Sequence, residues 1–289
     1  MKFSIVTASY QQLDWLKLCV QSVSDQKGDF EVEHLIQDGG SGPEFDEWAK
    51  VSAPPNWVSE PDQGMYDAIN RGFIRAQGEI LAWLNSDEQY LPGALARVAK
   101  AFKENPKCDL LFGDVVVTVP DGTPVAYRKA LMPWRSYIRS CHLPTFSAAA
   151  FVRRSLLDQC GLLDTRWRTI ADAVWVDQLL SKARPIILNE PLAVFSQTGE
   201  NLGMTSEAGK ELQRWRGECG TQSKIRREVL SAVQRIRKLL SLSYQGKNRR
   251  IKLYLPGSAS RIERSAIVSE RWPKKLGSSY YADDTSAGR

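Results

Sequence analysis

Apolar runs and helical apolar stripes alternate along residues 1–119. Four short runs have the length of buried strands: Phe3–Thr7, Glu31–Gln37, Ile80–Leu84 and Leu110–Val119. In 13–23, 69–76 and 91–102, apolar residues recur every three or four positions, which predicts amphipathic helices. Strands that alternate with helices form parallel sheets with helices on both faces. The sequence therefore predicts an α/β fold with a doubly wound, mostly parallel, Rossmann-like sheet.

A polar loop follows each of the first three predicted strands: Thr7–Tyr10, Asp38–Ser41 and Asn85–Glu88. The carboxyl ends of parallel strands meet at one edge of the sheet, where open α/β sheets bind their ligands. The third loop carries two carboxylates, and hard oxygen ligands of this kind suit a divalent cation that holds a diphosphate. We therefore expect the three loops to form one binding site.

Four segments carry a resemblance to a known family: Ile5–Tyr10, Gln37–Ser41, Ser59–Gly72 and Leu84–Glu88. In this order and at these spacings they resemble family 2 glycosyltransferases of the GT-A fold, in particular bacterial enzymes of cell-surface polysaccharide synthesis. The resemblance covers roughly residues 1–200. It implies an enzyme that transfers a sugar from a nucleotide-diphosphate donor to an acceptor hydroxyl.

The resemblance assigns the donor site to the three loops. Thr7 and Ser9 would line the nucleoside pocket, and Asp38 would accept a hydrogen bond from a uracil-type N–H. The family often has paired acids after the second strand, whereas Gly39 follows Asp38 here. Asp38 is also a residue that forms turns before glycines, so a purely structural role stays open.

A divalent metal, Mg²⁺ or Mn²⁺, is the cofactor that the resemblance implies. Asn85 stands where the family's Asp-x-Asp motif has its first acid, so metal binding would depend on Asp87, with Asn85 and Ser86 beside the donor. Arg71 would add a positive charge near the phosphates. The structural alternatives are a helix-capping role for Asp87 and a solvated helix charge for Arg71.

The resembled enzymes place a catalytic acid after a stretch such as Cys141–Ser147, and here that acid is Asp172. Its neighbours Ile170 and Trp175 would raise the pKa of the carboxyl by desolvation, which suits a general base near neutral pH. Asp177 is the rival residue, and an N-cap role is the structural alternative for Asp172. His142 is more simply explained as a loop histidine than as a catalytic one.

The charge distribution divides the chain. Residues 1–209 contain 20 Lys and Arg against 26 Asp and Glu, whereas residues 210–289 contain 19 against 7. We expect a glycosyltransferase domain in 1–209, a basic helical C-terminal extension in 210–276 and a disordered tail in 277–289.

The extension contains an apolar stripe at helical spacing: Ile225, Val229, Val233, Ile236, Leu239 and Leu240. Basic residues cover the other faces, which is typical of helices that bind an anionic membrane surface. A helix packed on the body, with its basic side in solvent, is the alternative. No nucleic-acid motif accompanies the basic residues, so nucleic-acid binding is not expected.

The segment Glu211–Trp215 resembles the Gln-x-x-Arg-Trp motif of processive synthases, but it begins with Glu and no run approaches the ~20 apolar residues of a membrane span. Processivity is therefore not expected. Five dispersed cysteines indicate reduced thiols and a cytoplasmic protein, with peripheral binding to the inner face of the cytoplasmic membrane left open.

These features together predict an inverting, metal-dependent, non-processive hexosyltransferase. Its donor would be a nucleotide sugar, with UDP-sugars favoured, and its acceptor a saccharide or a lipid-linked group in cell-surface polysaccharide or glycolipid synthesis. The alternative is a non-catalytic relative that binds sugar nucleotides or glycans, or a nucleotidyltransferase that uses the same acids. The presence of both Asp87 and Asp172 favours the enzyme.

Overall fold

The computed structural model describes residues 1–199, 201 and 205–270. Within them, nine strands form one sheet in the order β3-β2-β1-β4-β8-β6-β9-β5, with β7 paired to β6. The strands are β1 Lys2–Ser9, β2 Glu31–Asp38, β3 Asn56–Ser59, β4 Ile80–Trp83, β5 Glu88–Tyr90, β6 Leu110–Thr118, β7 Pro124–Arg128, β8 Ala150–Arg153 and β9 Pro185–Ser196. The segments that periodicity identifies as strands are β1, β2, β4 and β6.

The sheet is mixed but runs mostly in one direction. Strands β3, β2, β1 and β4 are parallel neighbours, and β6 is parallel to β9. Strand β8 is antiparallel to both β4 and β6, so these two point the same way. Strands β5 and β7 are antiparallel additions. The predicted mostly parallel sheet is confirmed, and the three reversed strands are the part that the sequence pattern did not indicate.

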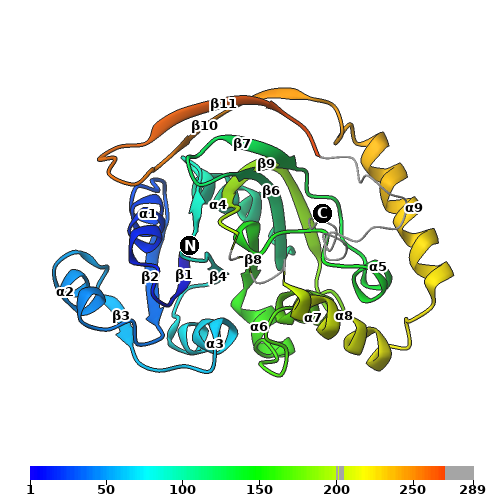
Figure 1. The fold of residues 1–289 in the computed structure, drawn as a ribbon, viewed down its shortest axis with the longest axis horizontal. Coiled ribbons are helices and arrows are strands. Elements are labelled where there is room, and N and C mark those ends of the chain that lie inside the picture. Colours follow the sequence, from blue (N-terminus) through cyan, green and yellow to red (C-terminus); the bar gives the residue numbers. More distant parts are fainter. Residues whose placement is uncertain (200, 202–204, 271–289) are drawn as a thin grey trace, which may run out of the picture.

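Helices cover both faces of the sheet (Figure 1). The first seven are α1 Leu13–Ser24, α2 Pro43–Ser52, α3 Met65–Arg75, α4 Ala94–Glu104, α5 Arg135–Ser140, α6 Arg154–Cys160 and α7 Ala171–Leu179. Strand β4 shows why two layers form, because its side chains alternate between the faces. Ile80 and Ala82 pack with α1 and α4, whereas Leu81 and Trp83 pack with α3, α6 and α7.

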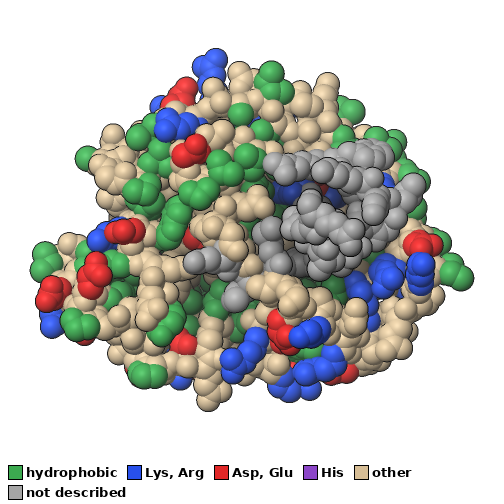
Figure 2. Space-filling view, viewed as in Figure 1, with side chains coloured by type: hydrophobic (Ala, Val, Ile, Leu, Met, Phe, Trp, Pro, Cys, Tyr) green, Lys and Arg blue, Asp and Glu red, His purple; other side chains and the backbone are tan. Residues whose placement is uncertain are grey.

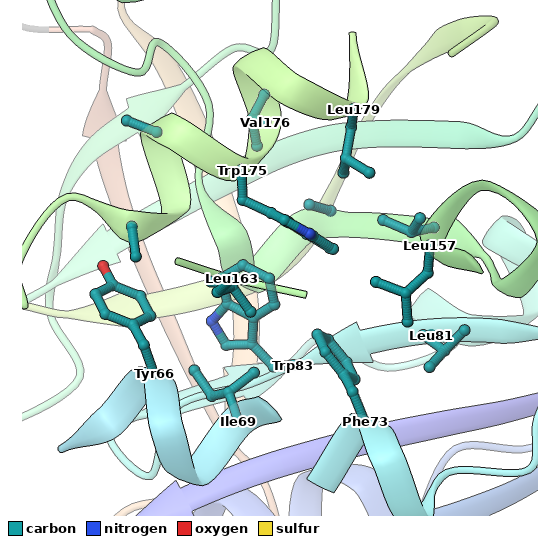
Figure 3. Close-up of a cluster of buried hydrophobic side chains, with 14 of the residues drawn as sticks. Tyr66, Ile69, Phe73, Leu81, Trp83, Leu157, Leu163, Trp175, Val176 and Leu179 are labelled. Atoms are coloured by element: carbon teal, nitrogen blue, oxygen red, sulfur yellow. The ribbon is translucent and has the colours of Figure 1, made fainter. Parts of the chain in front are cut away.

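The layer on the α3 side has an aromatic centre (Figure 3). The ring of Phe73 lies 6.0 Å from that of Trp83 and stacks at 6.0 Å on Trp175 of α7. All three side chains are buried. Because α3 and α7 share these rings with β4, both helices are fixed against the strand whose carboxyl end carries the acidic loop. Figure 3 shows Tyr66 at the edge of this cluster with its hydroxyl pointing toward α7.

The C-terminal extension contains helices α8 Ser206–Glu218 and α9 Lys224–Leu240, and then a two-stranded antiparallel ribbon, β10 Lys247–Leu253 and β11 Ile262–Val268. Ile251, Leu253 and Val268 of the ribbon pack on Val116 and Tyr127 of the sheet. The ribbon arches over the body between α1 and α9 (Figure 1). The extension is therefore helical only in its first half, and the predicted tail at 277–289 lies outside the described residues.

The charge division predicted from the sequence has a spatial counterpart. Figure 2 shows acidic side chains over α2 on the left of the view, and frequent Lys and Arg side chains on the right, where α8 and α9 lie. Among the described residues, no helix combines the length and apolar character that a membrane span requires.

Candidate active site

A cavity of about 870 Å³ opens at the carboxyl ends of β1, β2 and β4. Ser9 is the last residue of β1, Gly39 follows β2, and residues 85–88 follow β4. The opposite wall comes from the segment 142–147, from Thr169 and Asp172, and from Phe195 and Gln197 at the end of β9. The loops that the strand pattern places at one edge therefore meet in one cavity, large enough for a nucleotide-sized ligand.

Five of the eight residues selected from the sequence line this cavity: Ser9, Asn85, Ser86, Asp87 and Asp172. Ser86 donates a hydrogen bond to Gln12 Oε1 at 2.5 Å, which fixes the loop after β4 against the loop after β1. Asp172 comes from a different part of the chain, so the cavity lies between the strand-edge loops and α7.

Five buried polar atoms of residues that line the cavity have no hydrogen-bond partner among the described residues: Ser9 Oγ, Trp83 Nε1, Asn85 Oδ1, Thr145 Oγ1 and Glu270 Oε2. A buried polar atom without a partner costs about 1–3 kcal/mol. Such atoms are uncommon in folded proteins and call for an explanation. These atoms belong to residues of the cavity wall, but each atom is itself shielded from solvent, so a ligand would reach them only if the side chains moved.

The acidic loop after β4 is held by its own hydrogen bonds. The Asn85 backbone N–H donates to Glu88 Oε2 at 2.8 Å, and burial, followed by the charge of Asp87, raises the pKa of Glu88 to about 8. Asn201 Nδ2 donates to Asp87 Oδ2 at 3.0 Å. The helix that follows, α4, has Gly93 as its N-cap, so Asp87 does not cap it. The Asp87 carboxylate instead lines the cavity.

Asp172 sits in the first turn of α7, at the wall of the cavity. Its Oδ1 accepts hydrogen bonds from the Ala173 backbone N–H at 2.8 Å and from the Tyr66 hydroxyl at 3.2 Å. Desolvation raises the pKa of Asp172 to about 6, against the smaller opposing effect of these hydrogen bonds. A carboxylate with a pKa near 6 is ionised at neutral pH and is a stronger base than an ordinary Asp. The N-cap position belongs to Ile170.

Glu211 of α8 holds the loop that leads into α7. Its two carboxylate oxygens accept hydrogen bonds from the Arg168 N–H at 2.8 Å, the Thr169 N–H at 2.9 Å and the Thr169 hydroxyl at 2.7 Å. Arg214 stacks over Trp167 at 4.3 Å, and Trp215 is buried. The segment that resembles the Gln-x-x-Arg-Trp motif thus contacts the backbone three residues before Asp172.

Thr7 does not line the cavity. The side chains of β1 alternate between the faces of the sheet, and Thr7 lies on the same face as Phe3 and Ile5. Its Oγ1 lies 2.9 Å from His34 Nε2 and is completely buried. Ser9 is near Thr7 in sequence and also polar, but it ends the strand and reaches the cavity.

Asp38 is directed into its own loop. Its carboxylate accepts hydrogen bonds from the N–H groups of Gly40 and Ser41 at 3.0 and 2.7 Å, and from the hydroxyls of Ser41 and Ser59 at 2.6 and 2.8 Å. A carboxylate has about four acceptor sites, and these four donors use them. Asp38 is fully buried and does not line the cavity. In the structure it stabilises the turn after β2, which is the structural role that the sequence leaves open for it.

Arg71 is held outside the cavity. It pairs with Glu60 at 2.9 Å and with Asp67 at 2.8 Å, and donates to the Pro61 carbonyl at 3.1 Å. Pro61 lines the cavity, whereas Arg71 does not. Arg71 therefore stabilises the loop that contains Glu60 and Pro61 from the side that faces away from the cavity.

The structure also shows the surroundings of Asp177 and His142, the two other residues considered for a catalytic role. Asp177 is buried and accepts hydrogen bonds from Arg135 at 3.1 Å and from Arg139 at 2.8 Å, which makes it a structural ion-pair partner. His142 lines the cavity with Nε2 3.2 Å from the Tyr137 hydroxyl. Desolvation lowers the pKa of His142 to about 3, so it stays neutral and cannot act as an acid near pH 7.

The described residues contain no group of three or more His, Cys, Asp or Glu side chains able to hold a metal ion. Mg²⁺ is often bound by one or two carboxylates together with substrate phosphates, rather than by a complete protein cage. Asp87, which lines the cavity next to Asn85 in the loop after β4, fits such a shared site.

Sequence reasoning did not select Tyr66, Thr145 or Glu211 for the site. Tyr66 lies inside the quoted segment Ser59–Gly72, and Thr145 inside Cys141–Ser147, so both were within reach of a motif-based argument. Glu211 could have been found because a motif lookalike begins there. For none of these three residues does the residue type or the spacing in the sequence indicate which residue it contacts in the structure.

The comparisons with known proteins identify the family of the chain. Residues 4–161, more than half of the chain, match the model of glycosyl transferase family 2. The chain belongs to this family. An uncharacterized glycosyltransferase of Mycobacterium tuberculosis is 29% identical over 205 residues, 68% of this chain and 75% of the relative.

A PGL/p-HBAD biosynthesis glycosyltransferase of Mycobacterium bovis is 34% identical to this family 2 chain over 179 residues, 59% of this chain and 66% of the relative. Among solved structures, S. aureus TarS 1-349 in complex with UDP is similar at a TM-score of 0.52 and 17% identity, over 86% of this chain and 76% of that one. Another TarS 1-349 structure is matched over only 60% of its length. The structural likeness supports the glycosyltransferase fold.

Proposed function

We propose that this family 2 glycosyltransferase is an inverting, metal-dependent, non-processive hexosyltransferase with a UDP-sugar donor. The observation that carries the proposal is the cavity itself. It combines Asp87 on the strand-edge side with Asp172, whose pKa is raised, on the α7 side. Solved structures of TarS contain UDP and UDP-GlcNAc, which supports a uridine nucleotide as the first donor to test.

The donor's diphosphate would lie at the loop after β4. Asp87, with help from Asn85, would hold Mg²⁺ or Mn²⁺ there together with the phosphate oxygens. A metal in this position neutralises the charge that develops on the leaving nucleoside diphosphate. Ser9 and Ser86 would contact the donor from the loops after β1 and β4. In this proposal Thr7, Asp38 and Arg71 shape the walls instead of contacting the donor, because their polar groups are already engaged.

Asp172 would act as the general base of a single displacement. Its carboxylate takes the proton from the acceptor hydroxyl, the acceptor oxygen forms a bond to the anomeric carbon, and the bond from that carbon to the phosphate oxygen breaks with its electrons leaving on the nucleoside diphosphate. Attack from the face opposite the leaving group inverts the anomeric centre. Tyr66 keeps the carboxylate oriented through its hydrogen bond at 3.2 Å.

The acceptor is proposed to be a saccharide or a lipid-linked group, in cell-surface polysaccharide or glycolipid synthesis. One curated relative takes part in PGL/p-HBAD biosynthesis, which supports an acceptor of this kind. Five free cysteines support a cytoplasmic site of action.

The test is donor hydrolysis and UDP binding with Mn²⁺ or with chelator, for the intact protein and for Asp87→Ala. We expect donor hydrolysis and UDP binding by the intact protein to require the metal. In Asp87→Ala, turnover should fall at least ~100-fold, the typical size for loss of one charge-stabilising group. Glu47→Ala, an exposed carboxylate of α2, is the control and should behave like the intact protein.

Two outcomes would contradict the proposal. Activity of Asp87→Ala equal to that of the intact protein would remove Asp87 from the metal site. NMR of the product showing retention of the anomeric configuration would exclude single displacement. A screen of UDP-, GDP- and dTDP-sugars for metal-dependent binding identifies the nucleotide independently of the acceptor.

A further inference from the structure

Helix α9 packs on the body through polar side chains. Arg237 donates to the Met132 carbonyl at 2.8 Å and stacks over the Trp134 ring at 4.2 Å. Lys238 is paired with the buried carboxylate of Glu270. Gln234 is the buried residue of the helix. The inner side of α9 therefore includes Arg237 and Lys238, which have partners on the body, and the buried Gln234, which accepts a hydrogen bond from Arg237 at 3.0 Å.

The aliphatic residues of α9 face the other way. Six of the twelve large apolar side chains that are exposed among the described residues belong to this helix, with exposed fractions between 41% and 80%. We call them the outer face of α9: Ile225, Val229, Val233, Ile236, Leu239 and Leu240. An amphipathic helix of a water-soluble domain normally turns its apolar side to the core. This orientation also differs from the packed-helix alternative, in which the basic side faces solvent.

We propose that the outer face of α9 is a docking surface for an anionic lipid bilayer. Helices of this kind lie in the plane of the interface, with the apolar side among the acyl chains and basic residues at the headgroups. Helix α9 has 17 residues, about 25 Å at 1.5 Å per residue. A contiguous apolar strip of this length is typical of an interaction site.

The positive charge around the outer face of α9 favours an anionic lipid bilayer over other partners that could cover an apolar strip. Helix α9 contains six Lys and Arg and one Glu, and two of the six, Arg237 and Lys238, face the body. Lys224 and Arg226 are exposed at its start, and Lys247, Arg250 and Lys252 are exposed on the neighbouring β10. A basic residue near an anionic bilayer contributes roughly fivefold in affinity. The surface around the apolar strip is thus complementary to anionic headgroups.

A second copy of this chain is a poorer match for the same surface. In a two-fold dimer each patch meets its own copy, so the basic residues at the start of α9 would lie close to basic residues of the other copy. Like charges at an interface oppose association. The bilayer covers the same apolar side chains without this repulsion.

Docking through α9 would bring the cavity close to the bilayer. What this means for the reaction rests on the proposed function. Lys238 lines the cavity from the inner side of the helix, together with Glu270. A helix with its side chains is about 10–12 Å across. Docking through the outer face therefore places one wall of the cavity about one helix diameter from the bilayer, where the head of a lipid-linked acceptor lies.

The experiment is co-sedimentation of the full chain with vesicles of phosphatidylcholine alone and of phosphatidylcholine mixed equally with phosphatidylglycerol. We expect binding only to the anionic vesicles, and loss of most of it near 1 M salt, where the Debye length falls to ~3 Å. Binding needs neither donor nor metal, so its outcome is independent of the proposed reaction.

Two variants assign the binding to α9. Replacing Ile225, Ile236 and Leu240 together by Ser should weaken binding at least ~10-fold, because their exposed apolar area no longer enters the bilayer. Lys224→Gln with Arg226→Gln should weaken it about 25-fold at low salt. The matched control replaces Val51 of α2 and Ile74 of α3 by Ser, since these side chains are also strongly exposed, and should bind like the intact protein.

Three results would overturn the inference. One is absence of binding to anionic vesicles at low salt. Another is full binding by the triple Ser variant, with circular dichroism showing that it is folded. The third is a dimer of the intact protein in light scattering that the triple Ser variant converts to monomer, which would assign the outer face of α9 to a second copy.

Discussion

Helices α3 and α9 are both amphipathic, yet they turn opposite sides to the body. Helix α3 buries Tyr66, Ile69 and Phe73 in the aromatic cluster of Figure 3. Helix α9 exposes its aliphatic side chains and directs Arg237 and Lys238 inward. The periodicity of the two sequences indicates a helix in each case and gives no information about this difference.

The surroundings of the two helices explain it. Helix α3 lies on β1 and β4, whose Val6 and Trp83 present an apolar surface. Helix α9 faces a region that offers the Met132 carbonyl and the buried carboxylate of Glu270. A buried carboxylate is stable only when a cation pairs with it, so the basic side of α9 is needed there. The orientation of an amphipathic helix is thus decided by its receiving surface.

The largest expected effect is on the α3 side of the cavity, at Asp172. Asp172→Asn should lower turnover by ~10²–10⁴-fold, the usual contribution of a positioned base, with UDP binding nearly unchanged. Asp177→Asn is the control on the same helix. It should destabilise the fold, because Arg135 and Arg139 lose their partner, while turnover of the folded fraction is kept. Equal turnover of Asp172→Asn and the intact enzyme would move the base to another residue.

The pH dependence follows from the same residue. Because the pKa of Asp172 is raised to about 6, kcat/KM should fall about tenfold per pH unit below that value as the base is protonated. The folded state binds a proton that the unfolded state releases, so the free energy of unfolding should decrease as pH rises from 3.8 to about 6. Asp172→Asn should flatten this part of a stability titration. A rate that stays level down to pH 5 would contradict the assignment.

The next effect compares the two helices directly. Phe73→Ala in α3 should lower the free energy of unfolding by about 3–5 kcal/mol, as for other buried aromatic side chains. Leu240→Ala in α9 should change it by no more than about 0.5 kcal/mol, because Leu240 is 80% exposed. Chemical denaturation without lipid measures both values. Similar losses in the two variants would show that α9 is covered in solution, and the comparison would fail.

The smallest expected effect concerns Glu211, which acts on Asp172 through Thr169. Glu211→Gln removes one accepting oxygen and leaves a buried donor unpaired, which should cost about 1–3 kcal/mol of stability. If the loop positions the base, turnover should also fall, by up to ~10-fold, with donor affinity unchanged. Glu207→Gln, at an exposed position of the same helix, is the control. A loss of stability with intact turnover well below the melting temperature would leave Glu211 a purely structural role.

Sequence reasoning was accurate where one local pattern determines the structure. The apolar runs at Ile80–Leu84 and Leu110–Val119 are nearly β4 and β6, because runs of this length are buried as strands. Ser9 and Asp87 reach the cavity because Ser9 is the last residue of β1 and Asp87 lies in the loop after β4. The direction of the sheet and the meeting of the three loops follow from the same βαβ pattern.

The rest depends on partners that are distant in the sequence. Thr7 lies two residues before the end of β1, and its side chain contacts His34 of the neighbouring strand β2. Asp38 has the expected residue type, but the N–H groups of its own loop take its acceptor sites. Tyr66 lies 106 residues from Asp172 in the sequence, and no spacing rule predicts that contact. The inward side of α9 is set by Glu270, a residue beyond the helix.

The ribbon also constrains the order in which the chain can fold. Tyr254 and Arg261 bond to Asp25 at the end of α1, at 2.9 and 2.6 Å and across separations of 229 and 236 residues. Contacts between residues so far apart form slowly, because the closing of a long loop precedes any gain from the contact. During synthesis the first helix emerges from the ribosome long before its last partners. The contacts between the extension and α1 can therefore form only after the ribbon has been synthesised. Until then the N-terminal layer of the nascent enzyme lacks these contacts.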